Sequence, residues 1–326
     1  MNKTKSSVHP SISVLAHDLI PRTHKLHGSR SKLVPLSPTI IACIYSHEEG
    51  LASITFNLQS RKVLQKISIN GKYEPIVDSD SLIKDGDQNF IVVRCSNTEF
   101  QLLSVPRLKL RCVFKTQESE KSNLNFCYMN GEVITWFDDR SELTFWKLFA
   151  TTSSSVLKLP FAVGPYYSQL TNRDLLILQN SETNKLVFVN VKQKKVADTA
   201  KSEHHLNYSV NSEDRIFRSR TTFMQGAVSG EMLCDKLTSR LTLSSIGKLR
   251  LNGAGIQTHF LDGAKIILWQ NFWDLKLYEM TDKELITYKM ERPKNERYIG
   301  FLQLSQSRRM FCLVGENKSL MLLQFR

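Results

Sequence analysis

The stretch Asp262–Met290, DGAKIILWQNFWDLKLYEMTDKELITYKM, has the pattern that decides the fold. Three segments within it, Lys265–Gln270, Asp274–Met280 and Glu284–Met290, are rich in β-branched, aromatic and leucine residues and are separated by short polar turns. Such residues favour β-strands because their side chains pack well on a pleated, half-buried surface. The Asp262-Gly263 pair before the first segment is typical of a hairpin turn, because glycine tolerates positive φ. The stretch therefore predicts three consecutive antiparallel strands.

The same unit recurs along the chain. The middle strand of the opening stretch ends at Met280, and equivalent strand ends, each followed by a short polar turn, occur at Leu58, Val105, Phe149, Val191, Leu237 and Phe325. Successive ends are 42 to 47 residues apart, which is the period of four-stranded propeller blades. Candidate innermost strands are Leu124–Met129, Tyr166–Leu170, Ile256–Phe260 and Tyr298–Leu304. The fifth unit, roughly Leu206–Ile246 with Phe223–Val228 as its second strand, has the weakest pattern because Ser, Arg and Gly dilute it.

The two ends of the sequence are predicted to meet. The sequence ends at Arg326, one residue beyond the seventh marker strand, so the last unit lacks an outer strand. The alternating segment Ser11–Ala16, SISVLA, can supply that strand, because pairing removes an exposed sheet edge. The predicted fold is all-β: a seven-bladed β-propeller closed by an N-terminal strand, spanning residues 11–326 after a flexible basic segment of residues 1–10. The alternative is a pair of β-sandwiches, which also have short, evenly spaced strands.

Composition indicates a globular protein with acidic partners. Hydrophobic residues make up 41% and charged residues 23% of the 326 residues, so a sizeable core is expected. The formal net charge of +13 favours nucleic acid, an anionic membrane surface or an acidic protein face as partner. The alternative is a basic soluble protein without such a partner. No run approaches the roughly 18 apolar residues of a membrane span.

The cysteines and the N-terminus predict an intracellular protein, cytoplasmic or nuclear. The six cysteines are spread singly, with no C-x-x-C pair, which favours reduced thiols over disulfides or a zinc site. The first 32 residues are basic and polar and lack the apolar segment of a secretory signal. The histidines of this region, His17, His24 and His27, are interpreted as part of a solvated basic arm.

Residues 132–148, EVITWFDDRSELTFWKL, resemble a unit of the WD-repeat propellers. The acidic turn Asp138-Asp139 follows one strand, and Phe145-Trp146 ends the next, where the family often has its Trp. Tyr278 takes the Trp position in the sixth unit, but Phe272 stands where the family's structural Asp would lie. No unit has the family's Gly-His pair, and no Asp–His–Ser–Trp network can be assembled from the sequence. The resemblance implies the architecture alone and assigns no functional residue.

Signatures of catalysis are lacking in the sequence. It has no P-loop, no G-x-S-x-G and no H-E-x-x-H motif. No catalytic residue, no metal ligand and no cofactor is predicted, and we expect a non-enzymatic protein. The alternative is a propeller enzyme or small-ligand binder that uses a central channel. It would need several His, Asp or Glu side chains on the innermost strands, which are mostly apolar or neutral with His259 as the visible exception. A small-molecule ligand is not expected.

Charged residues alternate between the two kinds of turn. The turns before the outermost strands are basic, and the candidates for a basic face are Arg61, Lys62, Arg107, Lys109, Lys192, Lys194, Lys195 and Arg240. The turns between the second and third strands hold acidic residues instead, namely Glu48, Glu49, Glu99, Asp138, Asp139, Glu182, Glu231 and Glu316. In a propeller these two kinds of turn lie on opposite faces, so the sequence predicts one basic and one acidic face. The alternative is that such residues are simply common in turns.

Phe272 and Trp273 form the predicted protein-binding site, because an aromatic pair on a loop of a rigid scaffold can anchor a partner. The alternative is that Trp273 packs back onto a neighbouring unit. The predicted function is an interaction scaffold, a subunit or adaptor of a larger complex. Its basic face would contact an acidic surface or nucleic acid, and a nucleic acid would be held mainly by its phosphates.

Overall fold

A computed structural model of the 326-residue chain shows an all-β protein. It describes residues 10–21, 24, 26–71, 74–75, 82–96, 98–116, 124–138, 140–170, 173–183, 185–200, 207–210, 215–224, 227–241, 243–252, 257–261, 266–270, 275–280, 285–288, 298–305, 310–315 and 318–325. The chain divides into two compact units. Unit 1 contains residues 1–93, 103–110 and 259–326, and unit 2 contains residues 94–102 and 111–258.

The strands of unit 1 come from both ends of the sequence. In chain order they are β1 (Pro10–Ala16), β2 (Leu26–Ser37), β3 (Ile40–His47), β4 (Gly50–Asn57), β5 (Lys62–Asn70), β6 (Glu74–Pro75), β7 (Leu82–Asp85), β24 (Ile266–Gln270), β25 (Leu275–Met280), β26 (Leu285–Tyr288), β27 (Tyr298–Ser305), β28 (Met310–Gly315) and β29 (Leu320–Phe325). Four strands cross the division between the units: β8 (Gln88–Arg94), β9 (Glu99–Val105), β10 (Lys109–Lys115) and β23 (Gln257–Leu261).

The strands of unit 2 form three consecutive sheets. They are β11 (Leu124–Met129), β12 (Glu132–Phe137), β13 (Glu142–Lys147), β14 (Ser153–Lys158), β15 (Val163–Leu170), β16 (Leu175–Asn180), β17 (Leu186–Asn190), β18 (Lys195–Ala200), β19 (Asn207–Val210), β20 (Arg215–Met224), β21 (Ala227–Leu237) and β22 (Leu243–Asn252). Because β20 ends at Met224 and pairs with β21 through Met224 and Ala227, the predicted single strand Phe223–Val228 is wrong.

Within the described residues the strands form seven sheets. Five have four strands in sequence order: β2 to β5, β11 to β14, β15 to β18, β19 to β22 and β23 to β26. A sixth has the order β10-β9-β8-β6 with β7 also on β8, and the seventh has the order β1-β29-β28-β27. The described strand pairings are antiparallel, as short connections between consecutive strands require.

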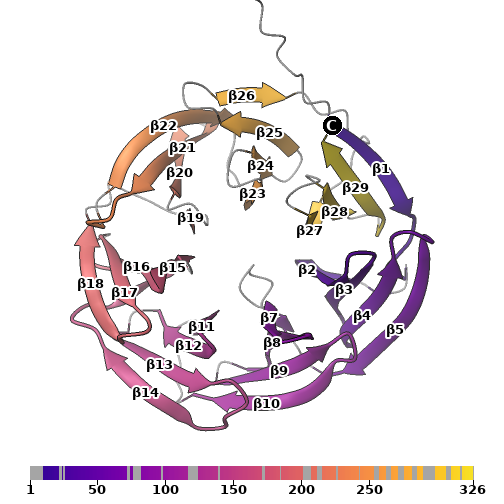
Figure 1. Ribbon diagram of the computed structural model, residues 1–326, viewed down its shortest axis with the longest axis horizontal. Coiled ribbons are helices and arrows are strands. Elements are labelled where there is room, and N and C mark those ends of the chain that lie inside the picture. The colour runs from indigo at the N-terminus through magenta and orange to yellow at the C-terminus, as the bar shows by residue number, and fades with distance from the viewer. Residues whose placement is uncertain are drawn as a thin grey trace, which may run out of the picture. The chain divides into compact units, whose positions relative to one another are not determined.

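The N-terminal strand completes the sheet of the last three strands, as predicted. β1 pairs antiparallel with β29, with Pro10 opposite Phe325 and Val14 opposite Met321, and Figure 1 shows the two strands side by side. The segment after β1 is also fixed. The backbone N–H of Leu19 donates to the carbonyl of Lys318 at 2.6 Å, and the Lys318 ammonium donates to the carbonyls of Pro21 and His24.

Continuous runs of buried residues along the inner strands give each unit its own core. In unit 1, Tyr45 of β3 and Ile54 and Phe56 of β4 are buried with Leu19, Ile20 and Leu320. In unit 2, Trp136 of β12 and Phe145 of β13 are buried with residues of β16 and β17. Burial of each such side chain contributes roughly 2 kcal/mol of transfer free energy. The outermost strands carry less apolar surface, and β5 is mostly exposed.

The outermost strands share a local distortion near the turn that precedes them. The register of β5, β14, β18 and β22 shifts against the neighbouring strand, which leaves one extra residue in each outer strand. Each described turn before an outermost strand contains a non-glycine residue with positive φ. These residues are Arg61, Leu108, Phe149, Lys194 and Leu241. Such bulges twist the end of an edge strand and make it a poorer template for pairing with another chain.

Candidate functional site

The turns before the outermost strands are held in place by the first turn of the same sheet. Both turns lie at one edge of an antiparallel sheet, because the chain reverses direction at each connection. The N–H of Leu58 donates to the carbonyl of Thr39 at 2.8 Å, and the N–H of Val191 donates to that of Asp174 at 2.9 Å. Leu148 and Gly131 are joined in the same way at 3.4 Å. These turns therefore form defined edges.

In unit 2 we define the turn edge as residues 130–132, 147–152, 173–174, 191–195 and 238–241. Contacts join its three sheets. The ammonium of Lys194, after β17, lies 2.9 Å from Oε1 of Glu132, at the start of β12. The guanidinium of Arg173, before β16, donates to the carbonyl of Thr238, after β21, at 2.9 Å. The edge is thus one continuous structure within unit 2.

Lys194 stabilises this edge. Its ammonium also donates to Oγ of Ser155 at 2.7 Å and lies 4.6 Å from the centre of the Phe145 ring. Its side chain is 32% exposed and that of Glu132 only 19%, so the ion pair is partly screened from solvent. The sequence predicts Lys194 as part of a basic face, and the structure places its charge against a carboxylate and an aromatic ring of the neighbouring sheet.

The other three predicted basic residues of unit 2 are exposed. Lys192, Lys195 and Arg240 all belong to the turn edge, together with Lys147 at the end of β13, which is exposed too. Within the described residues none of these four forms an ion pair. Among its described residues the edge has six cationic residues and two acidic ones, Glu132 and Asp174. The described part of the edge is therefore electropositive; the turn between β19 and β20, residues 211–214 with Glu213 and Asp214, lies outside the described residues.

Phe149 is a residue of this edge that the sequence reasoning did not select as a binding residue. It follows β13, has a φ of 68°, and is 46% exposed. Bulky residues seldom adopt left-handed conformations, so this position is strained. Hydrophobic periodicity in the sequence predicts Phe149 as the last residue of a strand. In the structure β13 ends two residues earlier, at Lys147, and Phe149 lies in the turn.

In unit 1 the predicted basic residues Arg61, Lys62, Arg107 and Lys109 are all exposed. Arg61 and Lys62 connect β4 to β5, and Arg107 and Lys109 connect β9 to β10. Exposed apolar side chains follow directly in the outer strands, namely Val63, Leu64 and Leu110. Whether the basic turns of the two units form one face stays a prediction.

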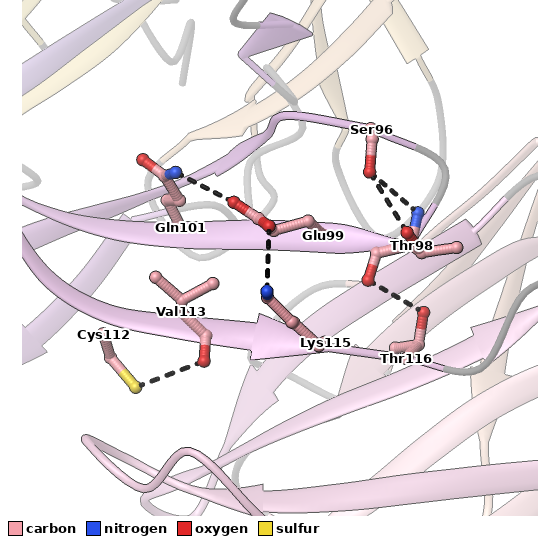
Figure 2. A network of polar contacts seen from close by, with 8 residues as sticks. All are labelled: Ser96, Thr98, Glu99, Gln101, Cys112, Val113, Lys115 and Thr116. Atoms are coloured by element: carbon pink, nitrogen blue, oxygen red, sulfur yellow. Dashed lines mark hydrogen bonds and ion pairs between the residues drawn. The ribbon is translucent and has the colours of Figure 1, made fainter.

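The acidic residues do not all stand in exposed turns. Glu48, Glu49 and Glu182 are exposed, whereas Asp138 is buried and accepts a 2.6 Å hydrogen bond from Asn125. Glu231 lies inside β21, so its assignment to a turn is wrong. Glu99 begins β9 and is held by Gln101 and Lys115, as Figure 2 shows, with 3.0 Å to Gln101 Nε2 and 3.9 Å to Lys115 Nζ. Asp139 and Glu316 lie outside the described residues.

Phe272 and Trp273, the predicted protein-binding pair, lie outside the described residues, between β24 and β25. They stay a prediction.

The unit that resembles a WD repeat contains part of a polar network. Nε1 of Trp146 donates to Oγ1 of Thr135 at 2.9 Å, and both residues are buried. Asn125 and Asp138 form a second, partly buried hydrogen bond in this sheet. The sequence predicts that no Asp–His–Ser–Trp network can be assembled, and the link seen here joins only Trp146 to the hydroxyl of Thr135.

His24 is packed against the sheet and does not belong to a solvated arm. Its ring stacks on His47 with 4.2 Å between ring centres and 11° between planes. Its Nδ1 is also hydrogen-bonded to the hydroxyl of the buried Tyr45 at 2.9 Å. Burial, and to a lesser extent the nearby Cys43, raises the pKa of Tyr45, so this phenol keeps its proton.

Four cysteines have described side chains, and all four are free thiols. Burial raises the pKa of Cys43 to about 12. Burial and the negative charge of Glu99 raise that of Cys95 to about 11. Such thiols are poor nucleophiles at neutral pH. In the described ranges no three His, Cys, Asp or Glu side chains are grouped so that they could hold a metal ion.

Over the same described ranges, no helix has the length and apolar character to cross a membrane.

The chain matches no protein-family profile and no curated protein, but its fold is similar to solved structures. One is the WD40 domain of coronin from Toxoplasma gondii, with a TM-score of 0.66, 11% identity, and coverage of 98% of this chain and 86% of that one. Another is the C-terminal WD40 domain of Sif2, with a TM-score of 0.58, 10% identity, and coverage of 96% and 98%.

The chain therefore has the architecture of a WD-repeat-like β-propeller. This confirms the all-β propeller predicted from the repeat. The arrangement of its sheets as seven blades of one closed ring stays a prediction.

Proposed function

We propose that this protein is a non-enzymatic interaction scaffold, whose exposed basic turns contact an acidic partner. The observation that carries the proposal is the state of the predicted basic residues. Seven of the eight are exposed, and within the described residues none of these seven forms an ion pair. Cations that stabilised the fold would resemble Lys194, which lies against a carboxylate of another sheet.

The scaffold supports this proposal. β-Sheets with buried cores hold the turns in place, and their backbones are fixed by the hydrogen bonds to Thr39 and Asp174. Turns fixed on a rigid scaffold commonly carry binding residues. Charge complementarity accelerates association and selects partners of opposite sign. The basic turns would therefore favour acidic partners over neutral ones.

The test is co-purification of partners with the full-length protein from an extract of its native source, at low and at high salt. Two variants accompany the wild type. One changes Arg61, Lys62, Arg107 and Lys109 to Gln, and the other changes Lys192, Lys195 and Arg240 to Gln. We expect a discrete protein partner at both salt concentrations and a reduced yield with at least one variant. Equal yields for all three proteins would refute the role of the basic turns.

A further inference from the structure

We propose that the turn edge of unit 2 binds an acidic segment of a protein partner, and that Phe149 contacts an apolar side chain of that segment. This inference rests on the proposed function and assigns it a place and a ligand chemistry.

The edge is one surface because its parts are joined by contacts. Phe149 follows Leu148, whose N–H donates to Gly131, and Gly131 precedes Glu132, which holds Lys194. From there the connection runs through Val191 to Asp174 and from Arg173 to Thr238, two residues before Arg240. A bound segment following this edge would meet Lys147, Lys195, Lys192 and Arg240 on three neighbouring sheets.

The positive charge of the edge favours a negatively charged ligand. Glu132 is satisfied by Lys194 and Ser154, which among the described residues of the edge leaves Asp174 against the four exposed cations Lys147, Lys192, Lys195 and Arg240. The Lys194 ammonium is bound to Glu132 and Ser155, whereas the exposed cations have no such contact among the described residues. Carboxylates of a partner can therefore bind the exposed cations and leave the contacts of Lys194 intact. An acidic segment would therefore bind without loss of the contacts that join the sheets.

Phe149 selects a peptide over a single-stranded nucleic acid. Single strands are bound by several aromatic rings on which successive bases stack, and Phe149 is the one exposed aromatic side chain among the described residues of this edge. A single ring among cations suits an apolar side chain flanked by carboxylates.

The test is fluorescence anisotropy with the full-length protein and labelled twelve-residue peptides. The first set has Asp and Glu around one central Leu, Ile or Phe; a control set has Gly at that position; a twelve-nucleotide oligo-dT tests the alternative ligand. The variant Phe149→Asn removes the ring while keeping a residue that accepts positive φ, and Phe149→Leu keeps an apolar side chain. Thermal melting verifies that both variants fold.

We expect the apolar acidic peptides to bind and the glycine peptides to bind more weakly. Phe149→Asn should weaken binding about tenfold, as loss of an interface anchor does, and Phe149→Leu by less. Changing Lys192, Lys195 and Arg240 to Gln should weaken it at least about tenfold at low ionic strength and by a smaller factor at high ionic strength, because salt screens exposed charges. The matched control, Arg61 and Lys62 changed to Gln, should have little effect.

Three results would overturn the inference: no binding by any apolar acidic peptide, equal binding by the glycine peptides, or tighter binding of oligo-dT that is lost in Phe149→Asn. The co-purification experiment separates this failure from failure of the proposed function. If partners co-purify with wild type and are lost only when Arg61, Lys62, Arg107 and Lys109 are changed to Gln, the scaffold function stands and only the assignment of this edge fails.

Discussion

Two turns of this molecule have nearly the same backbone but opposite side-chain roles. Residues 57–62, NLQSRK, connect β4 to β5, and residues 190–195, NVKQKK, connect β17 to β18. In both turns an asparagine Oδ1 accepts backbone hydrogen bonds, from Gln59 and Ser60 at Asn57 and from Gln193 at Asn190. The next residue of each turn donates its N–H to the first turn of the same sheet. The fifth residue of both is basic and left-handed, with φ of 54° at Arg61 and 50° at Lys194.

The difference lies in what surrounds the fifth residue. Lys194 reaches Glu132 and Ser155 of the adjacent sheet, whereas Arg61 is exposed. The same local sequence pattern therefore gives a structural cation in one turn and an exposed one in the other. The role of a basic turn residue depends on whether the neighbouring sheet offers a carboxylate within reach, and this is a property of the tertiary structure.

The largest expected effect is that of Lys194→Ala. It leaves the partly buried carboxylate of Glu132 without its cation, and loss of a charge-assisted contact of this kind costs about 2 kcal/mol of the free energy of unfolding. Urea denaturation measures the loss. The matched change Arg61→Ala should cost less than about 0.5 kcal/mol, as exposed substitutions usually do. Similar losses for the two variants would contradict the distinction between the turns.

The asparagines should matter about equally in both turns. Asn57→Ala removes two hydrogen bonds that fix its turn and Asn190→Ala removes one, and each change should lower the free energy of unfolding by about 1 kcal/mol. Urea denaturation again measures this, with Gln59→Ala, which replaces an exposed residue of the same turn, as control. A loss confined to Asn190 would show that the shared backbone is not stabilised in the same way.

A double-mutant cycle isolates the ion pair itself. We expect Lys194→Ala and Glu132→Ala together to cost less than the sum of the single changes, with a coupling energy of about 1 kcal/mol between the two residues. The coupling should persist at high salt, since partly buried pairs are screened less than exposed ones. Additive effects would mean that packing on Phe145, and not the carboxylate, determines the role of Lys194.

Arg61→Gly should have the smallest effect. Glycine relieves the left-handed strain but increases the conformational entropy of the unfolded chain, and these contributions of about 1 kcal/mol each nearly cancel. The free energy of unfolding should change by less than about 0.5 kcal/mol. Lys194→Gly has the same backbone effect but loses the ion pair, so it should be destabilising; an equally small change there would contradict the comparison.

The sequence predicts the fold well because the signals for it are local. Alternating apolar residues and polar turns recur along the chain, and edge pairing of Ser11–Ala16 follows from the lack of an outer strand in the last unit. Signals fail where they weaken, as in the fifth unit, where a two-residue turn between Met224 and Ala227 divides a predicted strand.

The candidate site is harder to predict because its contacts join distant parts of the sequence. Lys194 and Glu132 are 62 residues apart, and nothing in a turn rich in lysine distinguishes the one that is bound from those that are exposed. Phe149 was missed because a hydrophobic residue after a strand is usually part of it, and only the three-dimensional structure shows it in the turn.

The pairing of β1 with β29 has a consequence for biosynthesis. β1 leaves the ribosome long before β29 is synthesised. Leu19 and Ile20 therefore cannot pack against Leu320 while the intervening sheets form. Until then the nascent chain exposes the apolar surface of the unit 1 core and an unpaired strand, both of which favour aggregation. We therefore expect newly made chains to depend on chaperones until β29 has left the ribosome and paired with β1.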